Sequence, residues 1–124
     1  MLVLLPLLIV ACGDQGPTPE EQVRAAVAEF GSATESKDYQ ALCDDLLSPT
    51  LIDDVEAVGL PCEVALREGL SSVREPRLTI GRIQVDGQRA TAEVSTTAAG
   101  QDPSRDTLRL ENVDGVWKIA SLGS

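Results

Sequence analysis

The hydrophobic period of this chain changes once, near Arg77, and this change constrains the fold more than any other feature. Before Arg77, apolar residues recur at the spacing of amphipathic helices; after it, they alternate with polar residues as in half-buried strands. The 124 residues are enough for one small domain. Because the helical patterns all come first, we expect an α+β fold in which N-terminal helices pack on a curved antiparallel sheet.

Four helices are predicted between Thr18 and Gly69. Thr18-Pro19-Glu20-Glu21 supplies an N-cap hydroxyl, a proline at the first helical position and the glutamate of a capping box. A second helix is expected from Asp38, and Ser48-Pro49 and Pro61 begin two shorter ones. The residues expected to face inward are Val23, Val27, Phe30 and Thr34, then Tyr39, Leu42, Cys43, Leu46 and Leu47, then Leu51, Ile52 and Val55, and finally Cys62, Ala65 and Leu66.

Four strands in a meander are predicted for the remainder. Asp86-Gly87 and Asp114-Gly115 are typical hairpin turns, and residues 98–105 read as a loop, with the third strand starting at Thr107. Gly81 shifts the alternation, which predicts a β-bulge that curves the sheet. In the last strand, Trp117, Ile119 and Ser121 are expected on one face and Leu122 on the other.

An apolar run over residues 2–11 precedes these elements. Its length is typical of a signal-peptide core and is shorter than the roughly 20 residues that a membrane-spanning helix needs. The order Leu8-Ile9-Val10-Ala11-Cys12 resembles a bacterial lipobox, although no Lys or Arg comes before it. The resemblance implies a leader over 1–11, lipidation of Cys12, a tether over 12–17 and a location on the extracytoplasmic face of the cell membrane. The alternative is an ordinary apolar N-terminus with a chance cysteine.

Cys43 and Cys62 form the remaining pair of cysteines. In an exported protein, such a pair favours a structural disulfide between the second helix and the later one. Two buried free thiols are the alternative. Redox chemistry is a weaker one, because the chain has neither a C-x-x-C spacing nor a histidine that would lower the pKa of a thiol.

The charge and the absence of histidine exclude several functions. The net charge is −10, and residues 14–63 hold twelve Asp or Glu against Arg24 and Lys37, so we expect no nucleic-acid binding. Without histidine, Ser-His-Asp, Cys-His and His-metal sites are impossible. For the pairs Asp44/Asp45 and Asp53/Asp54, three interpretations stay open: solvated helix faces, a divalent-cation site or general acid–base work. We expect no metal and no cofactor.

Two segments, "KDYQALCDDLLSP" and "DGVWKIASL", together with the capped first helix, resemble the NTF2-like (SnoaL-like) superfamily. The similarity is closest to small lipoproteins of actinobacterial type in that family, and it covers residues 18–124. It implies a cone-shaped α+β barrel whose open end can form a pocket between the helices and the concave sheet. Some members of the family are isomerases or dehydratases, whereas others only bind ligands or partners.

The three aromatic side chains of the chain, Phe30, Tyr39 and Trp117, are the candidates for lining such a pocket. Tyr39 and Trp117 can equally serve in packing. No catalytic residue is assigned. The leading hypothesis is a membrane-tethered extracytoplasmic lipoprotein whose NTF2-like domain binds a small apolar ligand or an envelope protein without catalysis, with a homodimer as a further expectation. The alternative is an isomerase- or dehydratase-type enzyme that uses a carboxylate and Tyr39.

Overall fold

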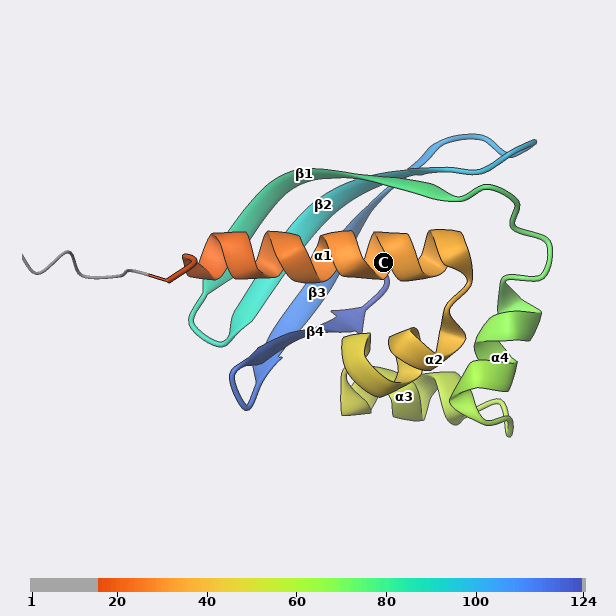
Figure 1. The fold of residues 1–124 in the computed structure, drawn as a ribbon, viewed down its shortest axis with the longest axis horizontal. Helices are drawn as coiled ribbons and strands as arrows, with labels where there is room; N and C mark the ends of the chain where they lie inside the picture. Colours follow the sequence, from red (N-terminus) through yellow and green to blue (C-terminus); the bar gives the residue numbers. More distant parts are fainter. Residues whose placement is uncertain (1–15, 124) are drawn as a thin grey trace, which may run out of the picture.

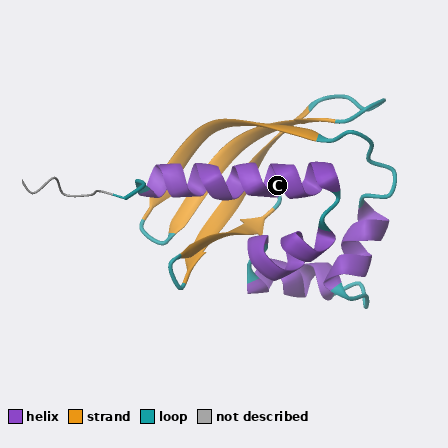
Figure 2. Ribbon diagram, in the orientation of Figure 1, coloured by secondary structure: helices purple, strands orange, loops and turns teal. Residues whose placement is uncertain are grey.

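The computed structural model describes residues 16–123, which form helices packed on one face of a four-stranded sheet (Figures 1 and 2). The helices are α1 (Pro19–Ser36), α2 (Tyr39–Ala41), the π-helical turn η1 (Leu42–Leu46), α3 (Pro49–Glu56) and α4 (Cys62–Gly69). The strands are β1 (Arg77–Asp86), β2 (Arg89–Thr97), β3 (Ser104–Val113) and β4 (Val116–Ser121), in the order β1-β2-β3-β4. The predicted α+β class and the antiparallel meander are confirmed.

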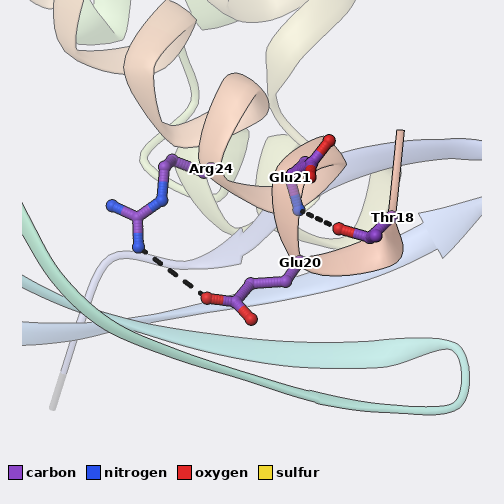
Figure 3. A network of polar contacts seen from close by, with 4 residues as sticks. All are labelled: Thr18, Glu20, Glu21 and Arg24. Atoms are coloured by element: carbon purple, nitrogen blue, oxygen red, sulfur yellow. Dashed lines mark hydrogen bonds and ion pairs between the residues drawn. The ribbon is translucent and has the colours of Figure 1, made fainter. Parts of the chain in front are cut away.

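The long helix α1 begins at the predicted cap and crosses the sheet. The Glu21 backbone amide donates to Thr18 Oγ1 at 3.2 Å, and the exposed ion pair from Arg24 to Glu20 spans 3.9 Å (Figure 3). The hydroxyl satisfies one of the free amides of the first turn, whereas an exposed ion pair of this kind contributes little. Val23 and Val27 are completely buried against the sheet. The capped end and these two valines therefore fix α1 on the sheet.

Two β-bulges bend the sheet around α1. The first lies between Ile80 and Ile83, because these residues pair with Val94 and Ala92; this is the predicted bulge at Gly81. The second is in β4, where two residues of β4 oppose one of β3. It reverses the alternation, so Leu122, which was expected on the face opposite Trp117, lies instead against the inner side of the sheet. The last strand was therefore misassigned beyond Ile119.

The third strand begins three residues earlier than expected. Ser104 pairs with Thr96 and Asp106 pairs with Val94, so the connection between β2 and β3 is shorter than the predicted loop. Pro103 and the polar residues around it read as loop in the sequence, but pairing with β2 extends the strand to Ser104. This extension lengthens the inner face of the sheet at one end.

Ser48 joins the helices to the free edge of the sheet. Its backbone amide donates to the Ile119 carbonyl oxygen at 2.8 Å, and Leu47 forms a parallel bridge with Ile119. Its side-chain oxygen accepts the Leu51 amide at 3.2 Å, which caps α3 as predicted. Ser48 is fully buried and has both polar groups satisfied. The segment thus covers part of the β4 edge, which would otherwise expose unpaired backbone groups.

The predicted disulfide is present between Cys43 in η1 and Cys62 at the start of α4, with Cα atoms 6.1 Å apart. Both cysteines are buried in the main hydrophobic cluster. The bond therefore ties the helical segment that precedes Ser48 to α4. Cys12, the predicted lipidation site, and the leader 1–11 lie outside the described residues. Among residues 16–123, no helix is long and apolar enough to cross a membrane.

Replacing both cysteines, Cys43→Ala with Cys62→Ala, is expected to lower the free energy of unfolding by about 3 kcal/mol, because the bond closes a loop across 19 residues of separation. Urea unfolding measures the change, and reduction of the parent protein should give a similar loss.

The native protein should show no thiol at Cys43 or Cys62 that can be alkylated under non-reducing conditions. Two reactive thiols there would contradict the crosslink.

Candidate functional site

A cavity of about 270 Å³ opens between the C-terminal half of α1 and the inner face of the sheet. It lies at the end of the sheet where α1 ends, near the β2–β3 connection and the segment that joins α4 to β1 (Figure 1). Its apolar wall comes from α1, the inner faces of β1, β2 and β3, the α4–β1 segment and the C-terminal residues: Phe30, Leu78, Val94, Leu108, Leu70, Val73 and Leu122.

The cavity exists because side chains fill the space between α1 and the sheet at one end of their contact and leave it partly empty at the other. At one end Val23 and Val27 fill the space between α1 and the sheet. At the other end α1 presents Gly31 and the short Thr34, and only Phe30 is large. Gly31 lies beside Leu78 of β1, and a Cβ there would be 3.4 Å from the Leu78 Cβ. The small side chains at this end of α1 leave a concave space between the helix and the sheet.

The floor of the cavity becomes polar toward its open end. Along β3 the inner face runs through buried Leu110 and Leu108 to Asp106 and Ser104, and Thr96 of β2 pairs with Ser104. The Thr96 and Ser104 hydroxyl oxygens are 2.7 Å apart, and the Ser104 hydroxyl donates to Asp106 Oδ2 at 3.3 Å. A half-buried carboxylate, braced by a hydroxyl pair, therefore faces the cavity.

The three aromatic candidates lie in three different environments. Phe30 lines the cavity. Tyr39 packs in a second hydrophobic cluster between the helices, with the Arg67 guanidinium carbon 5.6 Å from its ring centre. Trp117 is 6% exposed and sits in the main core, and its Nε1 has no hydrogen-bond acceptor within residues 16–123. Neither Tyr39 nor Trp117 lines the cavity, because their elements, α2 and the first half of β4, lie away from its opening.

The carboxylates noted in the sequence also lie elsewhere. Asp44, Asp45, Asp53 and Asp54 are exposed on η1 and α3, as solvated helix faces would be, and none lines the cavity. Within the described residues, no group of three or more His, Cys, Asp or Glu is placed to hold a metal ion.

Asp106 is the site residue that sequence reasoning missed. The alternation of Leu110 and Leu108 continues through it, and this period was the available signal. It was overlooked because Asp102-Pro103 placed the neighbouring residues in a loop and moved the start of the strand to Thr107. The pairing of β3 with β2 puts Asp106 on the inner face instead.

No protein-family model and no curated protein sequence matches this chain, but solved structures resemble it. The Kfla4162 protein from Kribbella flavida aligns with a TM-score of 0.56 and 16% identity, covering 81% of this chain and 84% of that one. The de novo designed NTF2 fold protein NT-9 aligns with a TM-score of 0.54 and 21% identity, covering 84% of this chain and 85% of that one.

TsrD from Streptomyces laurentii aligns with a TM-score of 0.52 and 18% identity, covering 86% of this chain and 94% of that one. At these identities the likeness concerns the fold and not the activity. The chain has an NTF2-like fold, as its sequence resemblance implied.

Proposed function

We propose that this protein is a membrane-tethered extracytoplasmic binding module that is anchored through lipidated Cys12 and holds a small, largely apolar ligand in its cavity without transforming it. The observation that carries the binding role is the cavity itself, which is lined mainly by aliphatic side chains and Phe30. A concave, mostly apolar site with a few polar groups is the usual form of a small-molecule site.

The size of the cavity limits the ligand. Its volume of about 270 Å³ lies just below the range of about 300–1,000 Å³ that is common for ligand pockets. The ligand should therefore be small, with its apolar part against Phe30, Leu78 and Leu108. Burial of that part contributes about 25 cal/mol per Å² of apolar surface removed from water.

The composition of the lining supports binding over catalysis. The enzyme hypothesis paired a carboxylate with Tyr39, and it requires both groups within hydrogen-bond reach of a shared substrate. Asp106 reaches the cavity, but Tyr39 packs against Arg67 in the other cluster. Histidine, the commonest general base, is absent from the chain. Asp106 is therefore better suited to hold a ligand than to exchange protons with it.

The position of the cavity along α1 supports delivery of the ligand from water. The tether ends where α1 begins, and Phe30 lies eleven residues after Pro19. At 1.5 Å per residue, the cavity is roughly 17 Å farther along the helix. In a protein anchored at Cys12, the opening therefore lies at the far end of α1 from the tether.

Filling the cavity should abolish ligand binding. Thr34 lines it from α1, so Thr34→Trp is expected to reduce binding of a neutral, environment-sensitive dye such as phenylnaphthylamine by at least about tenfold, by occupying its space. Fluorescence titration measures the affinity. Thr50→Trp, an exposed threonine of α3, is the matched control and should bind like the parent. Equal binding by both variants, or no binding by the parent, would contradict the proposed role.

Lipid anchoring is tested at Cys12. In a bacterial host that processes lipoproteins, Cys12→Ser should move the protein from the membrane fraction to the soluble fraction and abolish incorporation of labelled fatty acid, because acyl chains supply the membrane affinity. Gln15→Ser, which changes the tether and leaves the lipobox intact, is the control. Retention of the Cys12→Ser variant on the membrane would count against the anchor.

A further inference from the structure

The charged side chains that line the cavity include two aspartates that have no basic partner within the described part of the chain. The charged lining residues are Asp102, Asp106 and Arg77. Arg77 forms an ion pair of 3.8 Å with Glu35 of α1 at the rim. Within residues 16–123 the ion pairs are this one and that of Arg24 with Glu20, so neither aspartate is neutralised by a basic partner. Among the described residues, Asp102 and Asp106 therefore have no basic side chain within ion-pair distance, and the cationic lining residue, Arg77, is exposed and paired with Glu35.

Asp106 is the carboxylate best placed to act on a ligand. It is half-buried on the inner face, whereas Asp102 is exposed in the β2–β3 connection. Arg105, its neighbour in β3, is exposed and by strand alternation faces the opposite side of the sheet. The one side-chain donor to Asp106 in the described structure is the Ser104 hydroxyl, on Oδ2. The other oxygen, Oδ1, accepts no hydrogen bond within residues 16–123; Gly123 lies beside it, since a Cβ there would be 3.3 Å from Oδ1.

An aspartate at this position also departs from the pattern of its strand. The next inner positions of β3, Leu108 and Leu110, are buried aliphatic residues, and an apolar residue at 106 would extend the same core. A carboxylate that borders an apolar wall is partly desolvated, and such a group is stabilised by a cation or a strong hydrogen-bond donor. The Thr96–Ser104 hydroxyl pair orients the Asp106 carboxylate through one of its two oxygens, Oδ2.

We propose, on the basis of the binding role above, that the ligand is a small amphiphile with one protonated amino group. The ammonium donates to the Asp106 carboxylate, and the apolar part lies against Phe30, Val94 and Leu108. An ionised carboxylate only accepts hydrogen bonds, so it repels an anionic head group and holds a neutral hydroxyl by one uncharged donor. An ammonium gains both the hydrogen bond and the charge interaction.

The test uses three probes that share a phenyl ring on a short alkyl chain: phenylethylamine, phenylethanol and hydrocinnamate. Titration calorimetry of the purified protein at neutral pH and low salt is expected to show the amine binding about tenfold tighter than the alcohol, with the carboxylate weakest. Added salt should narrow the preference, since Asp106 is only half-buried. Equal affinities for amine and alcohol in the parent protein would overturn the inference.

Asp106→Asn keeps the shape of the side chain and removes its charge. It should weaken binding of the amine about tenfold, to the level of the alcohol, and leave the alcohol unchanged. The matched control is Glu93→Gln, which removes the same charge from an exposed position of β2 and should keep the preference for the amine. An amine preference that survives Asp106→Asn, or that disappears in Glu93→Gln, would overturn the role of Asp106.

The dye separates this inference from the proposed function. Binding of the neutral dye without any preference for the amine would overturn only the assignment of an amino ligand. Failure of the dye and of all three probes would overturn the binding function and this inference together.

Discussion

The bending of the sheet around α1 is the constraint on which the rest of the structure depends. A flat meander would touch a straight helix along one line, but the bulges at Gly81 and in β4 curve the strands so that the inner face wraps the helix. Val23 and Val27 then lose all contact with water. The cavity forms toward the other end of α1, where Phe30, Gly31 and Thr34 face the sheet without filling the space between them.

The shorter helices protect the open side of this arrangement. An antiparallel sheet that does not close leaves two edges, and the β4 edge is partly covered by the bridge from Leu47 and by the amide of Ser48. The Cys43–Cys62 bond holds the segment just before Ser48 to α4. The crosslink therefore stabilises the contact that covers the sheet edge, as well as restricting the unfolded chain.

The residues of the hydrophobic core and the residues of the cavity lie on the same strands, at different positions along them. On β3, Leu110 and Leu108 belong to the core, whereas Asp106 two residues away faces the cavity. A leucine at position 106 would bury more apolar surface. A carboxylate beside the core is the kind of local conflict with stability that is typical of functional positions. The cavity and its polar floor thus arise together, where β3 faces the C-terminal half of α1 and the space between them is not filled.

Much of the architecture was predictable from local signals. The capping residues Thr18 and Ser48, the Asp114-Gly115 turn and the phase shift at Gly81 each act within a few residues, and the structure shows them where they were expected. The first hairpin turn is formed by residues 87–88, one residue later than predicted, because Asp86 pairs with Arg89. The pairing of Cys43 with Cys62 was predicted from the expectation that Cys12 is lipidated and the domain exported, and the disulfide is present.

The candidate site was harder to predict from the sequence, because its parts are brought together by pairing and packing between distant segments. Nothing local reveals that Leu47 and Ser48 meet Ile119, or that a bulge in β4 turns Leu122 toward the cavity. Local propensity placed Ser104 in a loop, but its pairing with Thr96 adds it to the strand and brings Asp106 inward. By itself the sequence determined the order of elements and their caps and turns, because those depend on neighbours in the chain. Only the tertiary structure decided which side chains share the cavity, because that depends on strand register and on which residues of α1 face the sheet.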